Sequence, residues 1–166
     1  MEKTAENIKK QMESWLSRYY CKEKNKLSGK ELFTSFDLIS PKQKIKINNQ
    51  LKLRDNELPV FFLKISEEKL IVNTTERFIK LTNQGIEDIE YKNFKKHEGF
   101  DKFIIKKRLI RRNINVKTDG YLCCFCLKLK DGKIREWEIP TGTAGFGFWS
   151  VTKKCELIGR KYEVIK

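Results

Sequence analysis

The densest group of charged side chains in the sequence is a basic run that follows Asp101. It holds seven cations within 16 residues and no acid, namely Lys102, Lys106, Lys107, Arg108, Arg111, Arg112 and Lys117. Arginine can bind a phosphate or a carboxylate through two parallel hydrogen bonds. The basic run therefore predicts a surface that binds an acidic partner, although a solvated face with no partner is also compatible with it.

A second candidate is the glycine-rich stretch IPTGTAGFGFW, residues 139–149. A phosphate-binding loop needs Gly-Lys-Ser/Thr after its glycines, and a dinucleotide site needs a parallel βαβ unit, but neither pattern is present. The stretch instead predicts a strand that ends at Pro140 and joins a helix capped by Thr141 or Thr143. Gly145 and Gly147 would let the first helical turn approach the sheet closely or delay its start. Free N–H groups at the helix N-terminus predict a possible anion site: Thr141, Gly142 and Thr143.

Candidate metal ligands are few. His97 is the only histidine, so a site with two histidines is excluded, and we expect it to be an exposed loop residue. In CCFC, strand periodicity places Cys124 and Cys126 on one face and Cys123 and Phe125 on the other. This spacing differs from the C-x-x-C pairs of zinc sites, and it favours buried, apolar thiols. We therefore predict no metal and no cofactor.

Two carboxylates could in principle perform acid–base chemistry. Glu136 and Glu138 are two residues apart on a predicted strand and so share a face. The same pattern is typical of an exposed strand that faces lysines across a hairpin, here Lys128 and Lys130. Because no acid, base and nucleophile converge in the sequence, we predict that the protein is not an enzyme.

The net charge of the whole chain is positive, like that of the basic run. Its 166 residues carry a net charge of +14, and residues 101–166 contribute 16 Lys and Arg against 7 Asp and Glu. Such a field favours nucleic acid, anionic lipid or an acidic protein. The N-terminus lacks the apolar segment of a secretory signal, and no apolar run is long enough to cross a membrane. With five cysteines, an odd number, a reducing cytoplasm is the expected location.

The elements that must position these residues follow from periodicity. Residues 3–26 predict a helix, because Ile8, Met12, Trp15, Leu16 and Tyr19 recur at spacings of three and four. Pro41 marks a connector, and alternation over 44–53 predicts a strand. Further strands are expected at 60–65, on both sides of a turn at Asn73-Thr74, and over IEDIEY.

The C-terminal third predicts a hairpin and a closing helix. Residues 120–130 and 133–139 read as strands joined at Asp131-Gly132, which is a typical hairpin turn. One long helix should then begin near Thr143 and end at a cap on Gly159, with a short tail behind it. Its apolar seam would comprise Ala144, Phe148, Val151, Cys155 and Ile158.

Together these elements predict an α+β fold. It would consist of an N-terminal helix, a strongly bent antiparallel sheet or partly open barrel of about seven strands, and a C-terminal amphipathic helix that closes it. We divide the chain into an N-terminal helical segment, residues 1–40, and a β domain with its C-terminal helix, residues 41–166.

The stretch EEKLIVNTTERFIKL, residues 67–81, followed by IEDIEY and KNF, resembles bacterial pleckstrin-homology-like (PH-like) domains. The residues that match the family's strand–turn–strand pattern are Thr75, Glu76, Arg77, Phe78 and Ile79. The hairpin at Asp131-Gly132 and the last helix fit the family's ending, so the resemblance covers about residues 43–160. It implies a PH-like fold without shared catalytic residues, in a family whose members mostly bind proteins, peptides or lipids.

We therefore expect a small, non-enzymatic bacterial interaction domain of the adaptor or immunity-protein kind. Its partner would be an acidic protein or peptide bound by the basic run. Two alternatives use the same residues, namely binding of nucleic acid and binding of an anionic membrane surface.

Overall fold

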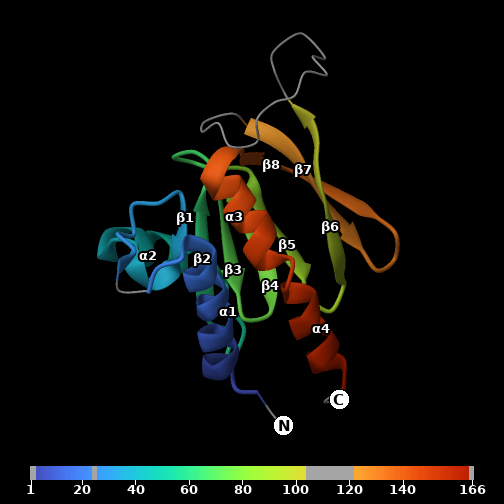
Figure 1. Ribbon diagram of the computed structural model, residues 1–166, viewed down its shortest axis with the longest axis horizontal. Coiled ribbons are helices and arrows are strands. Elements are labelled where there is room, and N and C mark those ends of the chain that lie inside the picture. The colour runs from blue at the N-terminus through green and yellow to red at the C-terminus, as the bar shows by residue number, and fades with distance from the viewer. Residues whose placement is uncertain (1–2, 24–25, 104–121, 165–166) are drawn as a thin grey trace.

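The computed structural model describes residues 3–23, 26–103 and 122–164, which form an α+β fold with two antiparallel sheets (Figure 1). The first sheet contains β1 (Phe33–Ser35), β2 (Pro59–Lys64), β3 (Leu70–Thr74), β4 (Arg77–Thr82) and β5 (Gly85–Glu90). The second contains β6 (Phe94–Phe103), β7 (Leu122–Leu129) and β8 (Ile134–Pro140). The helices are α1 (Ala5–Tyr20), the 3-10 turn η2 (Phe36–Leu38), α2 (Pro41–Asn48), α3 (Gly142–Thr152) and α4 (Cys155–Val164).

Both sheets are simple meanders, in which each strand pairs with the next one along the chain. The predicted α+β class is confirmed. The described strands form two separate sheets that do not close into a barrel. The turn between β3 and β4 lies at Thr75 and Glu76, slightly after the predicted position.

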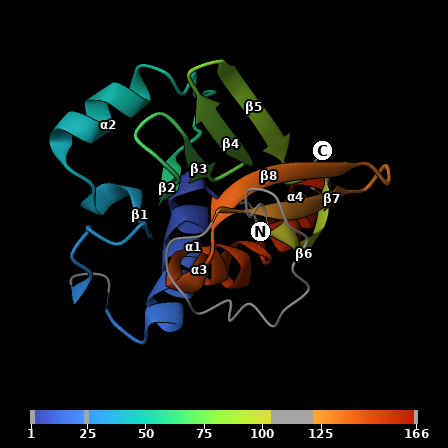
Figure 2. The same cartoon turned by 90° about the horizontal axis from the view of Figure 1, so that it is seen from above.

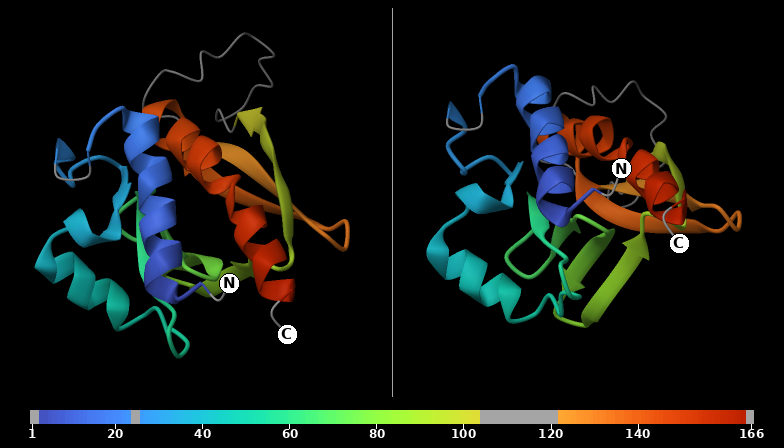
Figure 3. Two further views of the ribbon diagram at one scale, coloured as in Figure 1. Left: turned by 60° about the horizontal axis from the view of Figure 1, so that its bottom comes forward. Right: turned by 90° about the horizontal axis from the view of Figure 1, so that it is seen from below.

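The main core lies between the two sheets and the helices α1, α3 and α4, which lie together in Figure 3. Phe148 of α3 is at its centre, with its ring centroid 6.1 Å from that of Phe78 in the first sheet and 5.7 Å from that of Phe125 in the second. Every residue of the predicted C-terminal seam is buried there: Ala144, Phe148, Val151, Cys155 and Ile158. The amphipathic pattern of this region was therefore predicted correctly.

Helix α1 confirms the predicted N-terminal helix but ends at Tyr20, six residues before the predicted end at residue 26. Thr4 caps it by accepting a hydrogen bond from the N–H of Asn7, and Cys21 ends it in a left-handed conformation. Its apolar stripe packs into the main core, so the N-terminal segment contacts the first sheet and α3 directly.

The prediction of a strand over residues 44–53 was wrong, because α2 occupies the first half of this stretch and no strand follows in the second half. Ser40 and Gln43 form a reciprocal capping box and Pro41 is in the first turn, so the helix has three of its usual start signals. Ile47 is buried while Ile45 is 64% exposed. The spacing of these two isoleucines fits a strand, but the local hydrogen bonds favour the helix.

A second, smaller core lies under α2, on the opposite face of the first sheet from α1 and α3, as Figure 2 indicates from above. Ile47 and Leu51 pack there against Phe62, Val72 and Ile79. The first sheet is therefore covered on both faces. This explains why its central strands are apolar almost throughout rather than alternating.

The predicted single C-terminal helix is in fact two, because α3 ends at Thr152 and α4 begins at Cys155. Gly159 was expected to cap the helix but lies inside α4, which continues to Val164 into the predicted tail. A Cβ atom at Gly159 would stand 2.0 Å from the carbonyl oxygen of Tyr91. The glycine therefore serves close packing of α4 on the chain between β5 and β6.

Candidate interaction surface

Most of the basic run falls outside the described residues. Lys102 lies in β6, where its backbone pairs with Cys124, and the six other cations, Lys106, Lys107, Arg108, Arg111, Arg112 and Lys117, are not described. The points where the segment leaves and rejoins the fold are described. Phe103 pairs with Cys123, and Leu122 pairs with Pro140, two residues before α3 begins. The basic run is therefore attached at the end of the second sheet that adjoins the start of α3.

Three aromatic residues of α1 and α3 lie close together near this end; we call Tyr19, Phe146 and Trp149 the aromatic face. Ring centroids are 6.4 Å apart for Tyr19 and Phe146 and 6.3 Å apart for Phe146 and Trp149. Phe146 is 48% exposed, which is unusual for a phenylalanine, and the other two are half-buried. The aromatic face is thus an apolar surface available to a partner.

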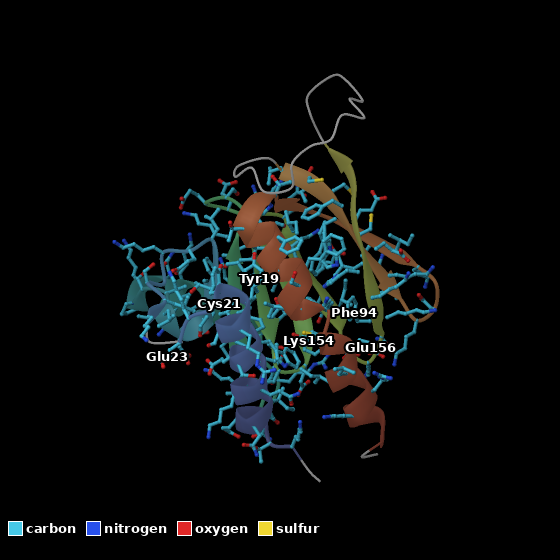
Figure 4. All side chains as sticks on the ribbon, viewed as in Figure 1. Tyr19, Cys21, Glu23, Phe94, Lys154 and Glu156 are labelled. Carbon is cyan, nitrogen blue, oxygen red and sulfur yellow. The ribbon has the colours of Figure 1, made fainter. Side chains whose placement is uncertain are left out.

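Close contact between α1 and α3 holds the aromatic face in place. The hydroxyl of Tyr19 donates a hydrogen bond of 2.8 Å to the carbonyl oxygen of Thr143, and Figure 4 shows Tyr19 on the side of α1 toward α3. A Cβ atom at Gly147 would lie 2.7 Å from the Tyr19 ring and 3.1 Å from that of Phe33. Gly147 therefore lets α3 approach α1 and β1 closely.

The expected close approach of the first turn of α3 to the sheet is confirmed for Gly145, where an added Cβ would lie 2.0 Å from the carbonyl oxygen of Pro140 in β8. The alternative, a delayed helix start, is wrong because α3 begins at Gly142.

The aromatic face is also tied to the sheet from which the basic run departs. The ring centroids of Trp149 and Phe100 of β6 are 6.0 Å apart, and Phe100 is three residues before the end of β6. Two exposed cations, Arg18 and Lys22, flank Tyr19 in the sequence. The surface therefore combines one exposed and two half-buried aromatic rings with cations that neighbour Tyr19 in the sequence.

Many of the described acids are already paired with described cations. These pairs are Lys9–Asp37, Lys26–Glu23, Arg54–Glu76, Arg54–Glu90, Lys64–Glu67, Lys69–Glu138, Arg77–Glu57, Arg77–Asp88, Lys80–Glu87, Lys92–Glu90, Lys96–Glu98, Lys128–Glu98, Lys133–Asp131 and Arg160–Glu156. Most are exposed and contribute little to stability individually. These acids pair with cations that lie outside the basic run. The chain as a whole still has a net charge of +14, which attracts an acidic partner.

The predicted anion site at Thr141, Gly142 and Thr143 falls at the N-terminus of α3. Thr141 is the N-cap residue, but its side chain makes no capping hydrogen bond. Thr141 and Gly142 are buried, and only Thr143 is exposed. The site stays a prediction, with one exposed residue of the three.

The prediction for His97 was wrong. It lies in β6, buried among aromatic rings, with the centroids of Phe94 and Phe125 at 4.8 and 4.9 Å. Its Nε2 is 2.8 Å from Oγ1 of Thr152, and its Nδ1 has no partner among the described residues. Burial, together with the nearby charge of Lys153, lowers the pKa of His97 to about 3. The residue is therefore a neutral core histidine rather than an exposed loop residue.

The strand faces around the cysteines were predicted correctly, but the register across the hairpin was not. Phe125 packs in the main core and Cys123, on the same face of β7, is buried, while Cys124 and Cys126 lie on the other face and are also buried. The exposed Glu136 lies opposite Cys126 rather than opposite a lysine. Glu138 lies opposite Cys124 and forms an ion pair with Lys69.

A buried ion pair that the sequence did not reveal fixes the turn between β3 and β4. Nε of Arg77 donates to Glu57 at 2.9 Å and its Nη2 donates to the same carboxylate at 3.0 Å, while a third nitrogen bonds Asp88. Burial acts to raise the pKa of Glu57, but the hydrogen bonds from Arg77 and Thr74 lower it overall. Because each charge is satisfied by its neighbours, this pair is structural rather than catalytic.

A shallow groove of about 240 Å³ between α2 and the first sheet was also not foreseen. Ile47, Phe62 and Leu81 form its apolar lining, and Lys46 and Lys64 stand beside them. The groove depends on α2 being a helix, and the strand predicted in that region concealed it. Lys64 is paired with Glu67, so the groove presents no converging catalytic groups among the described residues.

Comparisons with known proteins found no relative of this chain. No family model, no curated protein and no solved structure matches the chain. Within residues 3–23, 26–103 and 122–164, no helix combines the length and apolar character needed to cross a membrane.

Proposed function

We propose that this protein is a non-enzymatic interaction domain that recognises an acidic protein or peptide. The aromatic face would supply the apolar centre of the interface, and the basic run would supply its charged rim. The observation that carries the proposal is the exposed Phe146, held between Tyr19 and Trp149 near the points where the basic run joins the fold. Aromatic and arginine side chains are the residues most enriched at protein interfaces.

We further propose that the domain is PH-like, of the bacterial adaptor or immunity-protein kind. The order of elements supports this architecture: the four strands β2 to β5, then the three strands β6 to β8, and then the helix α3. The analogy supplies the class of function only, because the binding residues come from this chain's own surface.

The geometry of the rings favours a protein over nucleic acid. Bases stack on ring faces that are flat and accessible. Here the plane of Trp149 is inclined by 69° to that of Phe146 and by 77° to that of Phe100, and Phe146 is inclined by 41° to Tyr19. Rings packed edge to face make an uneven apolar surface, which suits the side chains of a protein partner better than a run of bases.

The test is a capture experiment from the native cell with matched variants. Phe146→Ser removes the exposed ring, and Arg111→Glu with Arg112→Glu reverses two charges in the basic run. The matched control, Lys42→Glu with Lys95→Glu, makes the same change of charge at exposed sites on α2 and β6. A protein captured by the wild type and the control, but lost with both site variants, is then purified and titrated.

Titration of the purified partner decides between the classes of ligand. We expect binding to a protein or acidic peptide to weaken with Phe146→Ser at every salt concentration, because that change removes apolar contact. Binding to single-stranded DNA or RNA that weakens steeply as the salt concentration rises would favour the nucleic-acid alternative. Sedimentation only with vesicles that contain anionic lipid would favour the membrane alternative. Either of those outcomes, or capture unchanged in both site variants, would overturn the proposal.

A further inference from the structure

The outward face of the second sheet carries a cluster of side chains that can bind a metal ion. The Sγ atoms of Cys124 and Cys126 and a carboxylate oxygen of Glu136 all lie within 4.8 Å of one another. The two cysteines belong to β7 and the glutamate to β8, so the cluster bridges neighbouring strands. None of these residues belongs to the aromatic face or the basic run.

The register of the hairpin produces this cluster. Cys124 and Cys126 are two residues apart on a strand and therefore share a face, while Phe125 between them fills the main core. Cys126 lies directly opposite Glu136, and Cys124 lies directly opposite Glu138. The thiols are only 8% and 4% exposed, whereas Glu136 is exposed. The site therefore has two fixed sulfur ligands and one carboxylate that can move to meet an ion.

The ligand types indicate which ion would bind. Thiolates exclude Mg²⁺ and Ca²⁺, which take oxygen ligands, and two sulfurs with one carboxylate suit Zn²⁺. In a tetrahedral site with Zn–S bonds of about 2.3 Å, the sulfur atoms stand roughly 3.8 Å apart. The observed separations, within 4.8 Å, need a contraction of at most about 1 Å, which side-chain rotation can supply.

A disulfide is the other reaction open to two neighbouring thiols, and the strand geometry opposes it. Two residues apart on a strand, their Cα atoms stand roughly 6.6 Å apart, near the upper limit for a disulfide. Neither cysteine forms a disulfide in the structure. A metal ion reaches the two sulfurs without bending the strand.

We propose that Cys124, Cys126 and Glu136 form a binding site for Zn²⁺ that ties β7 to β8. Binding releases the two thiol protons to solvent, and the resulting thiolates with the Glu136 carboxylate outweigh the charge of the ion. The fourth tetrahedral position is open to water or to Glu138. The site stabilises the hairpin that supports the main core from its outer side.

Cobalt titration of the full-length, tag-free protein tests the site, with a phosphine reductant in place of thiols. Co²⁺ bound by thiolates in a tetrahedral site gives a charge-transfer band in the near ultraviolet and visible bands from the metal. We expect these bands to saturate at one equivalent of Co²⁺ and to disappear when Zn²⁺ is added. Glu136→Gln should weaken Co²⁺ binding at least about tenfold, as loss of a supporting group in a metal site typically does.

Two cysteine variants provide the contrast. The double variant Cys124→Ser, Cys126→Ser should lose the charge-transfer band, while Cys21→Ser, which removes an exposed thiol at the end of α1, should keep it. In a second measurement, Zn²⁺ should raise the melting temperature of the wild type and leave that of the double variant unchanged. A wild type without the band, or a double variant that keeps it, would overturn the proposal, and circular dichroism checks that each variant is folded.

Discussion

For the replacement of Gly159 by alanine, the structure and helix propensity predict opposite effects on stability. Alanine inside a helix is more favourable than glycine by roughly 1 kcal/mol, so helix propensity alone predicts a gain in stability. In the structure, the added Cβ would lie 2.0 Å from the carbonyl oxygen and 2.4 Å from the carbonyl carbon of Tyr91. The atoms in the way belong to the backbone and cannot rotate aside.

Tyr91 is held too firmly to yield. Its N–H donates to the carbonyl oxygen of Glu76 at 2.9 Å, and its buried hydroxyl donates to that of Thr74 at 2.8 Å. α4 must therefore move outward, by about 1.4 Å if the new contact is to reach the ordinary 3.4 Å. Such a gap forfeits half or more of the packing of Ile158 and Cys155, a loss of about 3 kcal/mol, and leaves a net destabilisation of about 2 kcal/mol after the gain in propensity.

Urea unfolding at 25 °C, followed by circular dichroism, measures this difference. We expect the free energy of unfolding of Gly159→Ala to fall by about 2 kcal/mol, which corresponds to a melting temperature roughly 4–8 °C lower. Lys161→Ala, at an exposed position of the same helix, is the control and should change stability by less than about 0.5 kcal/mol. A Gly159→Ala variant as stable as the wild type, or more stable, would refute the close packing of α4 on Tyr91.

Three further predictions follow from buried or capping groups. The pKa of His97 is about 3 in the fold and near 6.5 in the unfolded chain. The contribution of the neutral histidine to stability is therefore complete above pH 6.5 and declines toward pH 3, by up to about 1.4 kcal/mol per pH unit. Urea unfolding at pH 7 and pH 5.5 should show this decline in the wild type and not in His97→Gln. Arg77→Met leaves the buried carboxylate of Glu57 without its cation and should destabilise the fold by about 3–5 kcal/mol. The double variant Arg77→Met, Glu57→Leu should recover most of that loss in the same assay. Equal losses in the two variants would contradict the pairing. Ser40→Ala removes the capping box of α2 and should lower the free energy of unfolding by about 1 kcal/mol, whereas a strand in this region would leave it unchanged.

Local patterns in the sequence predicted the parts of the fold whose stability is itself local. The hairpin of β7 and β8 follows from a dense apolar run before Asp131-Gly132 and alternation after it, and the buried seam around Phe148 follows from helical spacing. The error at α2 has a physical reason: Ile45 and Ile47 alternate as in a strand, but the capping box of Ser40 and Gln43 starts a helix just before them.

His97 was misplaced because β6 has an irregular register. Its pairing with β7 shifts between Phe94 and Lys96 and again between His97 and Gly99, so buried and exposed residues do not alternate. Flanked by charged residues in KKHEGF, the histidine resembles part of a loop. The rings that surround His97 come from β4, β7 and α3 as well as from β6, and these contacts reveal that it belongs to the core.

The candidate sites also differ in how far local sequence patterns predict them. The basic run follows from composition alone, whereas the aromatic face joins Tyr19 to Phe146, 127 positions away in sequence, a contact that no local pattern contains. The cysteine–glutamate cluster lies between these cases. Face parity paired the two cysteines correctly, but a two-residue shift in hairpin register decides whether Glu136 meets Cys126 or Lys128.

The strand β7 connects the two proposed sites while keeping them chemically independent. Its inward residue Phe125 lies 6.1 Å, ring centroid to ring centroid, from Trp149 of the aromatic face, and its outward residues Cys124 and Cys126 carry the proposed metal ligands. The proposed partner binding uses the aromatic face, on the side of β7 toward α3, and the proposed Zn²⁺ site uses the thiols on the other side. A Cys124→Ser, Cys126→Ser variant that still binds the partner, and a Phe146→Ser variant that still binds Co²⁺, would each follow from this arrangement. Loss of both activities in either single-site variant would instead mean that the hairpin transmits the binding of Zn²⁺ to α3 through Phe125.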